Sequence, residues 1–228
     1  MEDTQIEAAE ITARLARVDL FRHTIEAAKR TWQIDAVRDQ NRLLDASDHF
    51  EAFPYGLLLW DSSMILADTL GEMGTLEGRS VLELGAGVGL VGLVARHLGA
   101  EVMQTDYASE ALALALRNAQ LNAIEGITRR LADWTQWSMP GRFDFIVGSD
   151  ILYDASAHAP IAAVLDANLA EDGIAVFTDP GRTATPLFVQ KMREAGWQIE
   201  QTVRPIDAIQ QVLNFETVEI TTLKLRRG

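Results

Sequence analysis

Short hydrophobic runs alternate with amphipathic stretches over the middle of the chain. The runs predict five strands, at residues 81–84, 101–106, 127–131, 143–148 and 173–178. The amphipathic stretches predict helices at residues 90–97, 109–122, 158–169 and 186–195, with one more helix ahead of the first strand. Strands that alternate with helices in this way predict an α/β fold with a parallel sheet.

The end of the chain departs from this alternation. Two strands are predicted at residues 197–203 and 215–225, and no helix lies between them. Consecutive strands without a crossover helix pair in antiparallel fashion. We therefore expect an α/β fold with a Rossmann-like seven-stranded sheet, mostly parallel, with an antiparallel C-terminal pair of strands.

The N-terminal residues 4–45 show a different pattern. Hydrophobic residues recur there at spacings of three, four or seven, with charges of both signs between them: Ile11, Leu15, Val18, Ile25 and Trp32. This spacing predicts one long or two shorter amphipathic helices. We expect a helical extension over residues 1–50 and the α/β domain over residues 51–228.

Composition narrows the class of protein. The 228-residue chain has a formal net charge of −13 and no cysteine. The acidic balance disfavours binding to nucleic acid or anionic membranes, and the lack of cysteine excludes disulfides and thiolate metal sites. No signal peptide and no run of about 18 apolar residues is present. We expect a cytoplasmic protein without a metal, and the sequence does not indicate its oligomeric state.

A glycine-rich turn joins the first predicted strand to the next helix. Gly85, Gly87 and Gly89 follow the apolar run directly. Glycines accept backbone angles that other residues avoid, and a ligand can lie directly on their main chain. The free N–H groups at the start of the helix would face that ligand. This arrangement predicts a cofactor that contains a nucleoside.

Two cofactors fit the glycines. Gly87, Gly89 and Gly92 satisfy the G-x-G-x-x-G pattern of dinucleotide folds, and Asp106 lies at the end of the second strand. Counted from Glu83, the same segment has the pattern E-x-G-x-G-x-G. A carboxylate at Glu83 would suit a cofactor with an ammonium and a sulfonium, and it would repel a pyrophosphate. The antiparallel C-terminal strands favour the second interpretation.

The E-x-G-x-G-x-G segment resembles the first motif of class I S-adenosylmethionine (SAM) methyltransferases. The resemblance implies SAM as cofactor and S-adenosylhomocysteine as product, with Asp106 at the ribose. It places an acid and an aromatic residue after the third strand, Asp133 and Trp134, at the adenine. It implies a cofactor site with these further members: Trp60, Glu83, Gly85, Gly87, Gly89 and Ser149. Asp133 could instead stabilise an Asx turn, and Trp60 could be a core aromatic.

The sequence Asp150-Ile151-Leu152-Tyr153 resembles the D-x-x-Y signature of the seven-β-strand protein-lysine methyltransferases. Together with the segment FPYG before Trp60 and the turn DPGR that ends at Arg182, it is most similar to the branch that methylates the β subunit of electron transfer flavoprotein. The resemblance implies a protein substrate. It implies that Asp150 and Tyr153 hold and orient the lysine amine, and that Arg182 contacts the substrate.

Other functions remain compatible with the sequence. The same core serves small-molecule N- and O-methyltransferases. A protein that binds SAM without turnover would also keep the glycine turn, with its N-terminal helices closing the acceptor side. Asp150 could cap a turn at the edge of the sheet while Tyr153 packs beneath the next helix.

Overall fold

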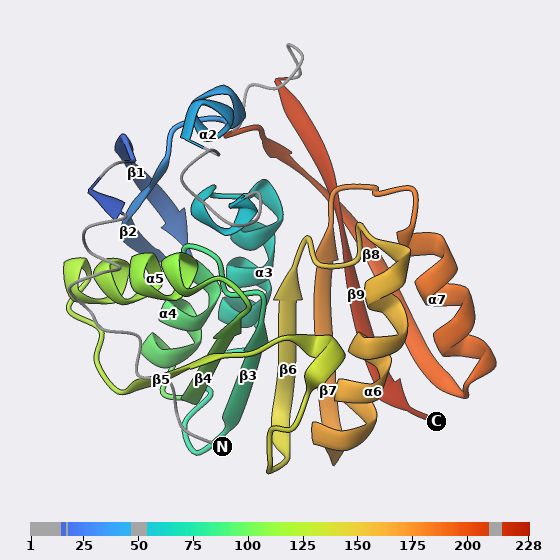
Figure 1. The fold of residues 1–228 in the computed structure, drawn as a ribbon. Coiled ribbons are helices and arrows are strands. Elements are labelled where there is room, and N and C mark those ends of the chain that lie inside the picture. The colour runs from blue at the N-terminus through green and yellow to red at the C-terminus, as the bar shows by residue number, and fades with distance from the viewer. Residues whose placement is uncertain (1–14, 17, 47–53, 210–215) are drawn as a thin grey trace.

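The computed structural model describes residues 15–16, 18–46, 54–209 and 216–228. Its centre is a seven-stranded sheet (Figure 1). In spatial order the strands are β5 (Ile127–Leu131), β4 (Glu101–Asp106), β3 (Ser80–Leu84), β6 (Phe143–Ser149), β7 (Leu169–Asp179), β9 (Thr217–Arg227) and β8 (Trp197–Asp207). The first five strands are parallel, while β9 runs antiparallel to both β7 and β8. The predicted sheet and its antiparallel C-terminal strands are confirmed.

Helices cover both faces of the sheet. One face carries α3 (Asp61–Glu72), α4 (Leu90–His97) and α5 (Ser109–Leu121), and the other carries α6 (His158–Asn168) and α7 (Thr185–Glu194). Short 3₁₀ helices, η2 (Tyr55–Leu57), η3 (Trp134–Gln136) and η4 (Ala155–Ala157), lie in the connections. Successive strand residues point to opposite faces. On β3, Val81 therefore packs with the α3 and α4 side, while Leu82 packs with α6 and α7.

The N-terminal segment folds as a hairpin, so the prediction of helices over residues 20–37 is wrong. β1 (Leu20–Ala27) pairs with β2 (Arg30–Val37), and α2 (Gln40–Ala46) follows. β2 is buried on both faces over its second half, where Ile34, Asp35, Ala36 and Val37 are all buried. Ile25 and Trp32 are seven residues apart, a spacing that a helix also produces. Residues 4–14 of the predicted helices, including Ile11, lie outside the described residues.

The hairpin is docked on α5 by two asparagines. Asn118 accepts from the backbone N–H of Asp35 at 2.8 Å and donates to the Asp35 carbonyl at 3.0 Å. Asn122, one helical turn later, does the same for Gln33 at 2.9 and 2.7 Å. Each side-chain amide therefore pairs with β2 as a neighbouring strand would, because an amide offers one donor group and one acceptor.

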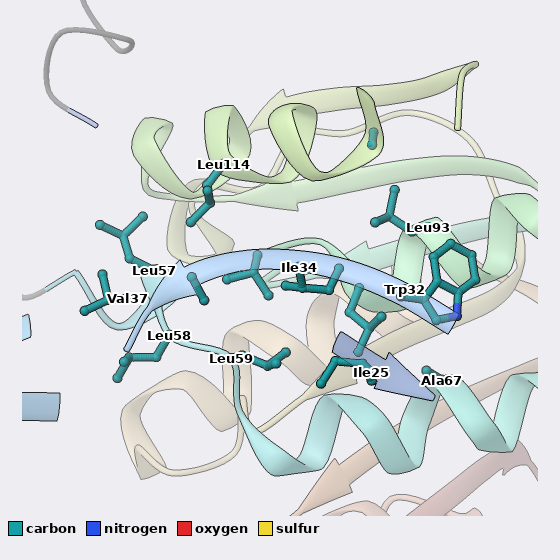
Figure 2. Packing of buried hydrophobic residues seen from close by; sticks show 14 of the residues in the cluster. Ile25, Trp32, Ile34, Val37, Leu57, Leu58, Leu59, Ala67, Leu93 and Leu114 are labelled. Carbon is teal, nitrogen blue, oxygen red and sulfur yellow. The ribbon is translucent and has the colours of Figure 1, made fainter. Parts of the chain in front are cut away.

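The hairpin shares a hydrophobic core with the helices beneath it. Buried residues of β1 and β2 form one cluster with residues of η2, α3, α4 and α5. Figure 2 shows these side chains on both sides of β2, with Leu114 of α5 on one side and Ala67 of α3 on the other. The hairpin is thus an added layer on the side of the sheet away from α6 and α7 (Figure 1). Among the described residues, no helix is long and apolar enough to cross a membrane.

Candidate active site

A cavity of about 340 Å³ opens at the carboxyl ends of β3, β4 and β6. This edge is where ligands bind in open α/β sheets. Most of the predicted site residues line the cavity: Trp60, Gly85, Gly87, Asp106, Trp134, Ser149, Asp150, Tyr153 and Arg182. Gly89, Glu83 and Asp133 are not among its lining residues.

The glycine turn requires its glycines for two different reasons. Gly85 and Gly87 line the cavity with φ values of +65° and +52°, which side chains rarely adopt. A Cβ at Gly87 would lie 3.2 Å from the carbonyl oxygen of Gly56. Gly89, the N-cap of α4, also has a positive φ of +88°, and a Cβ there would lie 2.7 Å from the Cβ of Ala115. Gly89 therefore allows α4 to pack against α5, whereas Gly85 and Gly87 form the cavity floor.

Asp106 is fixed by the main chain. Its Oδ2 accepts from the N–H of Gly87 and its Oδ1 from the N–H of Ala108, both at 2.9 Å. Burial raises the pKa of this carboxyl, and the backbone hydrogen bonds oppose that rise. A carboxylate accepts through about four lone-pair positions, so these bonds leave capacity for the hydroxyls of a ribose.

Glu83 lies away from the cavity, in contrast to its predicted place beside the cofactor. It points to the α4 side of β3, where its Oε2 accepts from the Nε2 of Gln104 at 2.8 Å and the backbone N–H of Gly92 also bonds to it. Burial raises the pKa of Glu83 to about 7. A Cβ at Gly92 would lie 2.6 Å from the carboxylate oxygen, so Gly92 makes room for Glu83.

Asp133 and Trp134 follow β5, but only Trp134 lines the cavity. The exposed Asp133 accepts from the N–H and the hydroxyl of Thr135, at 2.8 and 2.7 Å, which is the Asx-turn alternative. Trp134 lines the cavity and contacts the turn, since a Cβ at Gly85 would lie 3.5 Å from its ring. The buried indole N–H of Trp134 has no acceptor among the described residues.

Asp150 and Arg182 form an ion pair on the other side of the cavity. Arg182 donates from Nε to Oδ1 at 2.8 Å and from an Nη to Oδ2 at 2.5 Å. The Asp150 side chain is 4% exposed and that of Arg182 is 39% exposed. Asp150 has a φ of +52°, and its N–H donates to the carbonyl of Thr178 on β7. The structure thus brings these two predicted residues together, and the guanidinium covers the carboxylate.

Asp179 positions the turn that carries Arg182. Its Oδ1 accepts from the N–H groups of Gly181 and Arg182, both at 2.8 Å, and its Oδ2 accepts from the hydroxyl of Thr185 at 2.6 Å. The side chain of Asp179 therefore holds the DPGR turn against the start of α7. The buried carboxylate of Asp179 thus fixes the backbone of the turn, and the Arg182 side chain extends from it.

Aromatic rings surround the ion pair. Tyr55 lies 6.1 Å from Tyr153 and 6.4 Å from Trp60, measured between ring centroids. The guanidinium of Arg182 lies 5.6 Å from the ring centre of Trp60. Tyr153 is 50% exposed and lines the cavity, so it does not pack beneath the following helix. Burial raises the pKa of its phenol, which keeps the hydroxyl protonated.

Two tyrosines of the cavity were not predicted as site residues. Tyr107 directly follows Asp106 at the end of β4, and burial raises its pKa to about 12. Tyr55 belongs to the FPYG segment before Trp60. The sequence around each tyrosine could have indicated the site. Tyr107 directly follows the strand-end acid Asp106, and Tyr55 precedes Gly56, which lies against Gly87 of the glycine turn.

The strand order, the glycine floor and Asp106 are typical of class I, SAM-dependent methyltransferases. The cavity fits that cofactor because it combines a floor that a Cβ would obstruct, a buried carboxylate at the end of β4 and an unpaired indole donor. The chain belongs to the lysine methyltransferase family, whose sequence profile matches residues 38–195. This membership decides between the two cofactors in favour of SAM.

Individual relatives agree with the family. Protein N-lysine methyltransferase METTL21A from Xenopus tropicalis is 34% identical over 118 residues, 50% of this chain and 55% of that protein. The mouse protein of the same name is 39% identical over 105 residues, 42% of this chain and 47% of that protein. The alignments thus span about half the length of these relatives. The crystal structure of ribosomal protein L11 methylase from Lactobacillus delbrueckii superposes with a TM-score of 0.58 at 25% identity, covering 73% of this chain and 78% of that one.

Proposed function

We propose that the protein transfers a methyl group from SAM to the ε-amino group of a lysine in a protein substrate. One observation carries the proposal: a buried carboxylate, Asp150, and a phenol, Tyr153, line the same cavity as the glycine floor and Asp106. The residues that would hold the cofactor and those that would hold the acceptor thus line one cavity.

The chemistry requires little more than alignment and removal of a proton. Bound SAM supplies a methyl carbon made electrophilic by its sulfonium. The lysine arrives as an ammonium, with an unperturbed pKa of about 10.4, and must be neutral to attack. Asp150 accepts hydrogen bonds from the ammonium, orients it and receives or relays the proton. Tyr153, kept protonated, orients the nitrogen, and Tyr55 and Trp60 line the cavity beside it.

The nature of the substrate is a separate part of the proposal. A protein acceptor is supported by the protein N-lysine methyltransferase METTL21A relatives and by the lysine methyltransferase family. Within that class we propose the β subunit of electron transfer flavoprotein as the first candidate. Its support is the combination of the FPYG segment, the tetrad DILY and the turn DPGR in one chain.

The test incubates the purified protein with tritiated SAM and either a cell lysate or purified electron transfer flavoprotein. We expect label in a protein band, and mass spectrometry should assign it to lysine. The matched control is Asp150→Asn, which should lower the incorporation. Label that appears in small molecules or on another side chain would contradict the proposal, as would SAM binding without any incorporation. Label in a different protein would contradict only the flavoprotein assignment.

A further inference from the structure

The carboxylate of Asp150 is already paired with a cation of the same chain, Arg182. A carboxylate that is 4% exposed and has no positive partner would be costly in free energy. Arg182 meets that need with two parallel hydrogen bonds, the strongest arrangement between these groups. The same carboxylate is the one that the proposed reaction assigns to the substrate ammonium. Both cations require the same oxygen atoms.

The surroundings suit either cation. The guanidinium lies over Trp60 at 5.6 Å, and Tyr55 and Tyr153 stand beside it. Aromatic faces attract ammonium groups as well as guanidinium groups. An ammonium on Asp150 would therefore keep the favourable contacts that Arg182 now makes. Exchanging one cation for the other also leaves the net charge of this buried site unchanged.

The Arg182 side chain could occupy a second position, in a neighbouring groove. Its side chain is 39% exposed, so water reaches it in the pair. On its far side lies a groove of about 550 Å³, which Arg182 itself lines together with Asp179, Gln190 and Glu194. The groove offers Glu194 and Gln190 as acceptors to a displaced guanidinium, and it also contains the cationic Arg193. Because Asp179 anchors the backbone of Arg182, the side chain can rotate while its turn stays in place.

We propose that Arg182 is a placeholder cation, which neutralises Asp150 until the acceptor ammonium displaces it into the neighbouring groove. This inference rests on the proposed function for the identity of the acceptor. It differs from the expectation that Arg182 contacts the substrate directly. A direct contact predicts weaker substrate binding without Arg182, whereas a placeholder predicts tighter binding, because a resident ion pair no longer has to be broken.

The first experiment uses n-butylammonium chloride as a lysine side-chain probe and the variant Arg182→Met, which keeps a long apolar stem over Trp60. We expect the probe to raise the melting temperature of Arg182→Met more than that of the wild type. Its apparent dissociation constant should fall by about tenfold, because no charge-assisted bidentate bond competes. Equal concentrations of sodium chloride correct for screening.

Two control variants isolate the site. Arg204→Met removes an ion pair with Glu72 at 2.6 Å elsewhere on the surface and should respond as the wild type does. The double variant Asp150→Asn with Arg182→Met should lose the response, since no carboxylate remains. Equal responses in the wild type and Arg182→Met would overturn the proposal. So would a response that persists in the double variant.

A measurement on the wild type keeps the proposal testable if Arg182→Met does not fold. The Nε–H signal of Arg182, followed by NMR, should lose its protection from solvent exchange as n-butylammonium is added. An unchanged signal at saturating probe contradicts displacement. With an acceptor in hand, Arg182→Met should lower KM at similar kcat, and Arg182→Lys should restore an intermediate KM. A raised KM would identify Arg182 as a substrate contact.

The two proposals fail separately. If no methyl group is transferred to any protein, the proposed function fails, while the probe experiments still report on the cation exchange at Asp150. If methyl transfer to lysine occurs but Arg182 stays on Asp150 in the presence of the probe, the placeholder inference fails alone.

Discussion

Two carboxylates at the carboxyl ends of β4 and β6, the strands on either side of β3, divide the cavity into unlike halves. Asp106, the last residue of β4, is held by backbone N–H groups, which cannot leave without unfolding the turn. Asp150, after β6, is held by the guanidinium of one side chain, which can rotate away. Fixed donors suit a cofactor site that keeps one shape through every turnover. An exchangeable partner suits the half where a new substrate must enter each time.

The largest effect is expected from filling the Asp106 half of the cavity, where the donors are fixed. Gly87→Val places a branched side chain at φ +52° and a Cβ 3.2 Å from the Gly56 carbonyl. Calorimetry should show no detectable SAM binding. The matched control is Gly78→Val, at φ +71° with nothing within 4 Å of the added Cβ, which shares the backbone strain but not the contact. Normal SAM binding by Gly87→Val would show that the cofactor does not lie over this turn.

The next test removes the negative charge of Asp150, in the half of the cavity where the cation can be exchanged. Asp150→Asn keeps the shape and tolerates the left-handed backbone, since asparagine adopts positive φ readily. Turnover should fall by a factor on the order of 10² or more, the scale of a positioned base, while SAM affinity stays unchanged. Tyr153→Phe should reduce turnover less, because it removes only a hydroxyl. Loss of SAM binding in Asp150→Asn would assign this residue to the cofactor.

A third carboxylate, Glu83, sharpens the comparison because it lies outside both halves. Its folded pKa of about 7 exceeds its ordinary value of 4.5, so the folded state keeps a proton that the unfolded state has lost. Stability should therefore fall as the pH rises through this window, by roughly 3 kcal/mol in total. Urea unfolding of Glu83→Gln should show a flatter pH profile than the wild type, and the exposed Glu101→Gln should match the wild type. Parallel profiles in wild type and Glu83→Gln would contradict the shifted pKa.

The smallest effect concerns hydrogen bonds to the ribose. Asp106→Ala should weaken SAM binding by about 1.5–3 kcal/mol, roughly 10- to 150-fold. Asp144→Ala serves as the control, because Asp144 also accepts a strand N–H, from Ser80 at 2.8 Å, but does not line the cavity. Calorimetry should find unchanged affinity in that variant. An unchanged dissociation constant in Asp106→Ala would place the ribose elsewhere.

The central strands β3 and β6 could be predicted because they are short, mostly apolar runs that end beside a glycine or an acidic residue. β4 and β5 begin and end where the sequence placed them, at 101–106 and 127–131. The hairpin could not be predicted from hydrophobic spacing alone, since positions seven apart fit both a helix and a strand pair. The turn at Ala28 and Lys29, with φ of 50° and 60°, carries no glycine or asparagine to mark it.

The sequence indicates which residues reach the site better than it indicates which side chains contact each other there. A strand end delivers its residues to the sheet edge whatever their side chains do, and Asp106 and Asp150 both line the cavity there. The direction of Glu83 depends on the alternation along β3, and the same alternation puts Leu84 on the opposite face. The pairing of Asp150 with Arg182 joins residues 32 positions apart and follows from the docking of β7 beside β6, which no local pattern encodes.

The asparagines of α5 have a consequence for folding during synthesis. Asn118 and Asn122 lie 83 and 89 residues after the strand groups they pair with. At translation rates of about 5–20 residues per second, the hairpin leaves the ribosome roughly 4 to 18 seconds before its partners. An isolated two-stranded hairpin is marginally stable in water. The side of β2 that packs on α5 is therefore exposed to the nascent chain's surroundings for that interval.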